Sequence, residues 1–216
     1  NVPFTITAPS AVTATVSSNT SVTCNGASTG AFTITAGGGT GALSYNRGTG
    51  AQASGTFASL VAGNYVVTIT DANACSITQA VTVTQASRIT TTLSSSASVT
   101  CAGGSNGTFT VASTGGTPAY QFNRGTGSQA TGALTGLAAN TYNVTITDAN
   151  SCTITRSVTV AQPAAALGAG IASQTSVTCA GASTGAFTIS ATGGTSAYSF
   201  NRGTGAQASG TFTGLA

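Results

Sequence analysis

The sequence predicts an all-β fold made of tandem antiparallel β-sandwiches, each about 77 residues long. A Ser-Val-Thr-Cys motif recurs at intervals of 77 and 78 residues and ends at Cys24, Cys101 and Cys179. An Asn-Arg-Gly-Thr-Gly motif recurs at the same intervals and starts at Asn46, Asn123 and Asn201. Because independent motifs share one period, the chain is predicted to be a repeat protein. Within each period, apolar and polar side chains alternate every second residue, which is typical of half-buried strands.

The register of these motifs divides the chain into four segments. They are expected to be the last strand of a preceding repeat, repeat 1, repeat 2 and a truncated repeat 3, at residues 1–10, 11–86, 87–163 and 164–216. Repeat 3 is expected to stop before the Thr-Asp-Ala-Asn-Xaa-Cys motif, which starts at Thr70 in repeat 1 and at Thr147 in repeat 2. The chain is therefore expected to be a window cut from a longer array.

The elements of repeat 1 follow from local patterns. Alternating apolar residues rich in Val, Ile and Thr predict strands at residues 31–35, 65–70 and 81–83. Turn-forming residues separate such runs at 37–41, 48–50, 62–64 and 71–73. Short strands at this spacing, with no helical period, predict an immunoglobulin-like sandwich of about seven strands per repeat. In the hairpin at 71–73, Asn73 is expected to take the left-handed conformation.

The composition excludes most chemistry. The chain has five Arg and two Asp, and it lacks Lys, Glu and His. Without His or Glu, most general acid–base catalysis, most zinc sites and any Ser-His-Asp triad are excluded, so no catalytic residue is assigned and no enzyme is predicted. We also expect no cofactor and no bound metal. A net charge of +3 is too weak for a nucleic-acid partner, and no apolar run is long enough for membrane insertion in this segment.

The cysteines recur in pairs. Cys24 and Cys75 are 51 residues apart, and so are Cys101 and Cys152. This spacing predicts the disulfides Cys24–Cys75 and Cys101–Cys152, with the partner of Cys179 beyond the last residue. Such bonds would stabilise a small domain whose core gives marginal stability, and they would place the protein outside the cytosol. The alternative is that the cysteines are buried free thiols. Metal binding is disfavoured because no Cys-Xaa-Xaa-Cys motif and no His is present.

The charged residues also follow the repeat. Five of them are candidates for a ligand contact or a contact between repeats: Arg47, Arg124, Arg202, Asp71 and Asp148. The arginines could contact an anionic glycan or a neighbouring fibre, could pair with the aspartates, or could be loop residues with solvated head groups. One carboxylate per repeat is a poor supply for Ca²⁺, so the aspartates are expected to stabilise turns.

Several strings carry a family resemblance. They are Val22–Gly30, Gly193–Thr195 with Tyr198–Asn201, Asn140–Cys152 and Ala208–Ala216. Together they resemble the SprB repeat family, found in very large surface adhesins of gliding and other Bacteroidota. The resemblance implies export, typically by the type IX secretion system, a cell-surface filament, and a role in adhesion or gliding motility. It implies no catalytic residues.

These observations favour a structural and adhesive segment of an extracellular, cell-surface filament. Short linkers at 85–88 and 162–165 predict a stiff array. One alternative is a glycan-binding module that uses the repeated Asn-Arg-Gly-Thr-Gly loops. Another is a short subunit of a strand-exchanged fibre, in which residues 1–10 add to a neighbouring sheet. The expected partners are therefore neighbouring repeats or filament protomers, with surface polysaccharide as a second class.

Overall fold

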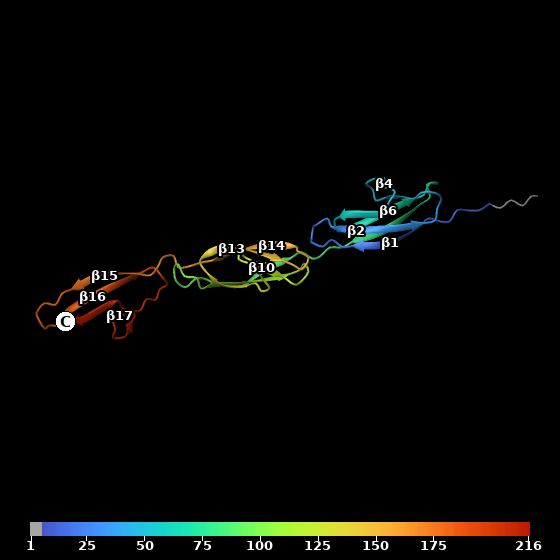
Figure 1. Ribbon diagram of the computed structural model, residues 1–216. Coiled ribbons are helices and arrows are strands. Elements are labelled where there is room, and N and C mark those ends of the chain that lie inside the picture. The colour runs from blue at the N-terminus through green and yellow to red at the C-terminus, as the bar shows by residue number, and fades with distance from the viewer. Residues whose placement is uncertain (1–5) are drawn as a thin grey trace, which may run out of the picture. The chain divides into compact units, whose positions relative to one another are not determined.

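The computed structural model describes residues 6–216, and its regular secondary structure consists of β-strands (Figure 1). Every pairing between adjacent strands that has a defined register is antiparallel. The predicted all-β fold of tandem small antiparallel domains is thus confirmed. No helix in the described part of the chain is long and apolar enough to cross a membrane.

The contacts within the chain define two compact units. The first comprises Asn1–Thr90, Ser113–Tyr120 and Ile146–Ile154. The second comprises Thr91–Ala112, Gln121–Thr145 and Thr155–Ala216. Repeat 2 contributes to both units, because its segments Ser113–Tyr120 and Ile146–Ile154 belong to the unit that contains repeat 1.

Repeat 1 is built from two sheets. The three-stranded sheet has the order β1-β2-β5, with bounds Thr13–Thr20, Gly30–Gly37 and Thr56–Leu60. The four-stranded sheet has the order β4-β3-β6-β7, with bounds Ala51–Gln52, Ser44–Asn46, Gly63–Thr70 and Ser76–Val83. The strand β6 pairs along its whole length with β7, from Gly63 opposite Val83 to Thr70 opposite Ser76.

The same two sheets recur in repeat 2. One has the order β12-β9-β8, with bounds Ala133–Leu137, Gly107–Thr114 and Thr90–Ala97. The other has the order β11-β10-β13-β14, with bounds Ser128–Gln129, Gln121–Asn123, Asn140–Thr147 and Thr153–Val160.

Repeat 3 differs in its second sheet. Its first sheet has the order β15-β16-β19, with bounds Gly168–Thr175, Gly185–Thr192 and Thr211–Leu215. Its second sheet pairs only β17 with β18, with bounds Phe200–Asn201 and Ala206–Gln207. Within the described chain, repeat 3 has no counterpart of the β6–β7 hairpin.

The core of repeat 1 follows the predicted alternation. Phe32 and Ile34 on β2 are 1% and 2% exposed, while Val67 and Ile69 on β6 are fully buried. Val66, which directly precedes Val67 and lies on the opposite face of β6, is 56% exposed. Side chains from the two sheets therefore meet between them, because successive side chains of a strand point to opposite faces.

The strand predicted at residues 1–10 can be compared with the structure only at residues 6–10. Residues 1–5 lie outside the described residues. Residues 6–10 form no strand, and Ile6 is 85% exposed. The expectation for Asn73 was wrong, because the left-handed residue in that hairpin is Ala74, with φ of 65°. Its counterpart in repeat 2 is Ser151, with φ of 64°.

Candidate functional site

A disulfide joins two successive repeats. Cys24 of repeat 1 is bonded to Cys152 of repeat 2, with a distance of 5.5 Å between their Cα atoms. Both residues lie in the first compact unit. Their separation of 128 residues equals one period plus the 51-residue spacing within a repeat. The predicted pairings Cys24–Cys75 and Cys101–Cys152 were therefore wrong, although the residue types and their period were correctly read.

The geometry of the sandwich explains the different pairing. The backbone N–H of Val22, close to Cys24, donates to the carbonyl of Thr84, just after β7. Cys75 directly precedes the first residue of β7, whereas the segment that leads to Cys24 contacts the residue after the end of β7. The two cysteines therefore lie about one length of this eight-residue strand apart in space. At about 3.3 Å per residue they lie on the order of 25 Å apart, at opposite ends of repeat 1. A disulfide needs Cα atoms within about 7 Å, so a bond within the repeat is excluded.

The remaining cysteines are free and exposed. They are Cys75, Cys101 and Cys179. The alternative of buried free thiols is thus also wrong for these residues. By position, Cys101 and Cys179 correspond to Cys24, and Cys75 corresponds to Cys152.

The linker between repeats 1 and 2 is held at both ends. The Gln85 side chain accepts a hydrogen bond of 2.8 Å from the backbone N–H of Gly26. The Asn25 side-chain amide donates to the carbonyl of Ala86 at 3.2 Å. On the other side, Gly116 N–H of repeat 2 donates to the carbonyl of Ser87 at 2.8 Å. The loop that carries Cys24 therefore binds the linker directly.

A buried aspartate shapes the turn that carries Cys152. Asp148 is 4% exposed, and its Oδ1 accepts hydrogen bonds of 2.9 Å from the backbone N–H groups of Asn150 and Cys152. Its Oδ2 accepts a third, also 2.9 Å, from the N–H of Thr117. These bonds fix the turn and hence the position of the cysteine. This is the turn-stabilising role expected for the aspartates.

Asp71 makes the same contacts in repeat 1. Its carboxylate accepts from the N–H groups of Thr40, Asn73 and Cys75 at 2.8, 2.9 and 2.8 Å. The hydrogen bond from Thr40 is the main cause that lowers the pKa of Asp71, against a smaller opposing effect of burial. For Asp148, burial is the largest single influence and raises the pKa. The three backbone hydrogen bonds together outweigh it, and the pKa is lowered.

The candidate arginines pack on aromatic rings of their own repeat. The guanidinium carbon of Arg47 lies 5.9 Å from the ring centroids of both Phe57 and Tyr65. That of Arg124 lies 5.8 Å from the Tyr142 centroid. Such cation–π contacts contribute about 0.5–1 kcal/mol at exposed sites. The arginines and the aspartates thus make separate local contacts, whereas Arg202 lines a groove in repeat 3.

The hydrogen bonds of the two linker glutamines were not predicted from the sequence. Gln85 and Gln162 occupy one repeat position, and Gln162 accepts from Gly103 N–H at 2.9 Å as Gln85 does from Gly26. A signal for these bonds was present, because a glutamine is the first residue of both predicted linkers, 85–88 and 162–165. No group of three or more His, Cys, Asp or Glu is placed to hold a metal ion in residues 6–216.

Two segments of the chain match a known protein family. Residues 93–127 and 171–205 match the SprB repeat family. Neither match indicates a catalytic family. No curated protein matches the chain.

Solved structures with similarity to the chain include three sets of tandem modules. The three N-terminal domains of the highly immunogenic outer capsid protein of bacteriophage RB49 are 13% identical, with 88% of this chain and 71% of that chain covered and a TM-score of 0.39. The fibronectin(III)-like modules of CbhA from Clostridium thermocellum are 14% identical, with coverage of 69% and 95% and a TM-score of 0.30. Sidekick-1 immunoglobulin domains 1–5 are 11% identical, with coverage of 91% and 49% and a TM-score of 0.35.

Proposed function

Because the chain contains SprB repeats, which belong to cell-surface proteins, we propose that it is a structural and adhesive segment of an extracellular filament. The family resemblance extends this proposal to export by the type IX system and to a role in adhesion or gliding motility. The disulfide is consistent with a location outside the cytoplasm, since such bonds persist in oxidising compartments.

The observation that carries the proposal is the covalent bond between successive repeats. With Cys24 bonded to Cys152, force applied along the chain passes directly from one cysteine to the other. The residues between them, which form most of the two sandwiches, then bear no covalent load. A segment that must transmit tension between a cell and a surface would benefit from this protection.

Force spectroscopy on the single chain tests the load-bearing part of the proposal. The oxidised chain should extend less than the Cys24→Ser variant by about 450 Å, because 128 residues at about 3.5 Å each are kept out of the extended length. A Cys75→Ser variant is the matched control and should behave like the oxidised chain. Equal extension of the oxidised chain and the Cys24→Ser variant would contradict the proposal.

The location is tested on cells that produce the protein. Antibodies against the chain should label intact cells, and Cys24 and Cys152 should resist alkylation until a reductant is added. Recovery of the native chain inside cells with both thiols alkylated would overturn the extracellular role.

The second candidate is a glycan-binding module that uses the Asn-Arg-Gly-Thr-Gly loops. Arg47 and Arg124 are half-buried, so part of each side chain stays accessible beside an aromatic ring. Binding on a glycan array that is lost with Arg124→Ala and kept with Arg88→Ala, an exposed arginine outside these loops, would support it. Equal binding by both variants would count against it.

A further inference from the structure

The junction between repeats 1 and 2 contains an open cavity beside the disulfide. Its volume is about 370 Å³, which suits a small ligand, and residues 24–25, 86–89 and 151–154 form most of its wall. All of these residues belong to the first compact unit. Cys24 and Cys152 both line this junction cavity, and both are half-buried. A small molecule in the cavity therefore lies next to the disulfide bond.

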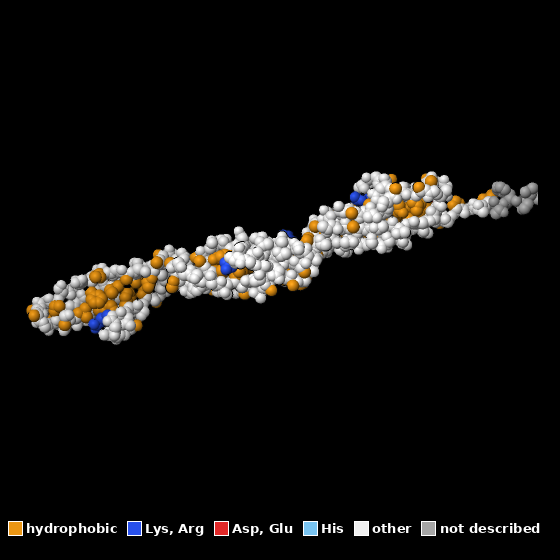
Figure 2. All heavy atoms as spheres, viewed as in Figure 1, with side chains coloured by type: hydrophobic (Ala, Val, Ile, Leu, Met, Phe, Trp, Pro, Cys, Tyr) orange, Lys and Arg blue, Asp and Glu red, His pale blue; other side chains and the backbone are white. Residues whose placement is uncertain are grey.

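The accessible charge in the wall of the junction cavity is positive. The charged residues of the wall are Arg88 and Asp148. The carboxylate of Asp148 already accepts three backbone hydrogen bonds, and the residue is 4% exposed. Arg88, in contrast, is exposed. Figure 2 shows arginine side chains as isolated points on the face drawn, with no acidic side chain among them. A small anion that enters the cavity therefore meets an uncompensated positive charge.

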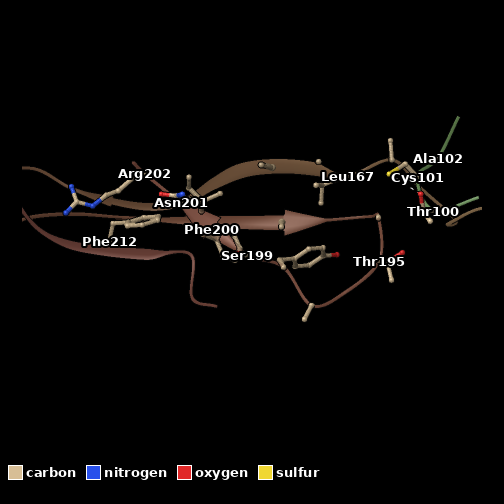
Figure 3. Close-up of a pocket in the computed structure, with 18 of the residues that line it drawn as sticks. Thr100, Cys101, Ala102, Leu167, Thr195, Ser199, Phe200, Asn201, Arg202 and Phe212 are labelled. Carbon is tan, nitrogen blue, oxygen red and sulfur yellow. Dashed lines mark hydrogen bonds between the residues drawn. The ribbon is translucent and has the colours of Figure 1, made fainter. Parts of the chain in front are cut away.

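Arg88 lacks the contacts that hold other arginines. The arginines of the Asn-Arg-Gly-Thr-Gly loops in repeats 1 and 2 pack on aromatic rings, and Figure 3 shows Arg202 close to Phe212 in the groove of repeat 3. Arg156 donates a hydrogen bond of 3.1 Å to the carbonyl of Thr91. Within residues 6–216, the guanidinium of Arg88 makes no hydrogen bond, ion pair or aromatic contact. It is therefore available to a ligand.

The repeat pattern indicates that the fold does not require this arginine. The equivalent residues are Ala11 in repeat 1 and Ala166 in repeat 3. The carbonyl of the residue before each of these three positions accepts a 2.8 Å hydrogen bond from a glycine N–H, that of Gly39, Gly116 or Gly194. The backbone contact is therefore the same whether alanine or arginine follows. Arg88 adds a guanidinium to the junction that carries the Cys24–Cys152 bond.

We propose that the junction cavity binds a small anionic thiol, which then exchanges with the Cys24–Cys152 disulfide. The guanidinium of Arg88 attracts the anionic group, and the thiol lies beside the disulfide. The ligand class is a low-molecular-weight thiol that carries a carboxylate, such as 3-mercaptopropionate. This inference does not depend on the filament role, because it concerns only the cavity and the bond in its wall.

The exchange takes place in two balanced steps. In the first, the thiolate sulfur of the ligand bonds to Cys152 Sγ, and the bond between the two cysteines breaks. Its electron pair leaves on Cys24 Sγ, which takes a proton from water. In the second, another thiolate of the same class attacks the ligand sulfur of this mixed disulfide, and Cys152 leaves as a thiolate and is protonated. Two ligand molecules are thereby oxidised to one disulfide.

The position of the carboxylates favours attack on Cys152. Asp148 Oδ1 accepts a 2.9 Å hydrogen bond from the backbone N–H of Cys152, so a thiolate leaving there would form in a turn that already holds a negative charge. The other acidic residue of the chain, Asp71, binds the backbone of Cys75 in the corresponding turn of repeat 1. Because the loop of Cys24 holds no acidic residue, the leaving thiolate forms there.

Reduction kinetics of the oxidised 216-residue chain test the proposal. The free thiols of Cys75, Cys101 and Cys179 are first blocked with iodoacetamide. The chain is then treated with 3-mercaptopropionate, 2-mercaptoethanol or cysteamine, which are anionic, neutral and cationic. After an acid quench and removal of the reagent, opened cysteines are labelled with N-ethylmaleimide and counted by mass spectrometry. Each rate is divided by the rate for the same disulfide in the urea-unfolded chain at the same ionic strength, which corrects for the intrinsic reactivity of each thiol.

We expect an order of rates that follows the charge of the thiol. At an ionic strength of about 0.01 M, the normalised rate should be about 5-fold higher for the anionic thiol than for the neutral one, and lowest for the cationic one. About 1 M NaCl should abolish this order, because it shortens the Debye length from about 30 Å to about 3 Å. Samples quenched in acid during the reaction and digested with pepsin should carry the mixed disulfide mainly on Cys152.

Three substitutions assign the effect to Arg88. Arg88→Ala introduces the residue that the other two repeats have at this position, and it should remove the preference for the anionic thiol. Arg88→Lys keeps the charge and should keep the preference. Arg47→Ala is the matched control, because it removes one positive charge outside the cavity wall, and it should also keep the preference. Equal normalised rates for the three thiols, a preference that survives Arg88→Ala, or a mixed disulfide mainly on Cys24 would overturn the proposal.

Discussion

Cys24 and Cys75 belong to the same repeat and stand at opposite ends of it, so Cys24 is bonded to Cys152 of the following repeat instead. The bond adds a covalent link beside the peptide linker, whose residues Gln85 and Ala86 are already bound by the loop that carries Cys24. The carboxylate of Asp148 holds the turn that carries Cys152 in place. Two repeats therefore share one connected set of contacts, and this has measurable consequences for their stability.

Loss of the Cys24–Cys152 bond should destabilise repeats 1 and 2. Closing a loop of 128 residues contributes about 5 kcal/mol in the chain-entropy model. Cys24→Ser and Cys152→Ser should lower the denaturant midpoint by the same amount as reduction does. Cys75→Ser is the control, because that thiol is free and exposed, and it should leave the midpoint unchanged. A midpoint that responds equally to all three substitutions would contradict the bond seen here.

The free energy of unfolding should fall in acid because two carboxylates, those of Asp71 and Asp148, become protonated. Asp71 and Asp148 are the only acidic side chains, and both have a lowered pKa in the folded protein. Because the folded pKa lies below the unfolded value of about 3.9, their stabilisation is complete above that value and is lost as the pH falls through the folded pKa. The urea midpoint should be level from pH 5 to 7 and should drop below about pH 4.

The aspartate origin of this pH dependence can be checked by substitution. Asn in place of each aspartate would put a side-chain amide N–H, which is a donor, opposite a backbone N–H that also donates. The Asp71→Asn, Asp148→Asn variant should therefore be less stable at neutral pH and should lose most of the acid dependence. An unchanged acid transition in this variant would assign the effect elsewhere.

A glycine should improve each of the two aspartate turns. Ala74 and Ser151 have φ values of 65° and 64°, in the left-handed region that disfavours residues with a Cβ atom. Ala74→Gly and Ser151→Gly should each raise the free energy of unfolding by about 0.5–1 kcal/mol. Ala72→Gly, two residues earlier in the same turn, should have no such benefit. Destabilisation by both left-handed substitutions would contradict the backbone conformation.

The sequence predicted the strands well because their signal is local. The alternation at Phe32 and Ile34 depends only on neighbouring residues, and both side chains are buried as predicted. The turns at Asp71 and Asp148 were predicted for the same reason. The left-handed position at Ala74 is harder to predict from sequence. Asn73 prefers the left-handed region, but its backbone N–H is bound by the carboxylate of Asp71, and Ala74 takes the positive φ instead.

The disulfide was mispredicted because a repeat period leaves the pairing undetermined. Spacings of 51 and 128 residues differ by one period of 77, so Cys24 has an equivalent partner in its own repeat and in the next. The choice between these two partners depends on which end of the sandwich each cysteine-bearing loop lies at. That position follows from the number of strands between Cys24 and Cys75, which the motifs alone do not give.

The register of β6 provides a last test, with two adjacent residues of one type. Val67 is fully buried between the sheets, whereas Val66 on the opposite face is 56% exposed. Val67→Ala removes buried methyl groups and leaves a cavity, so it should lower the free energy of unfolding by about 2 kcal/mol. Val66→Ala should change it by less than about 0.5 kcal/mol. A reversed order of the two effects in equilibrium denaturation would mean that β6 is shifted by one residue, since a one-residue slip moves every side chain to the other face.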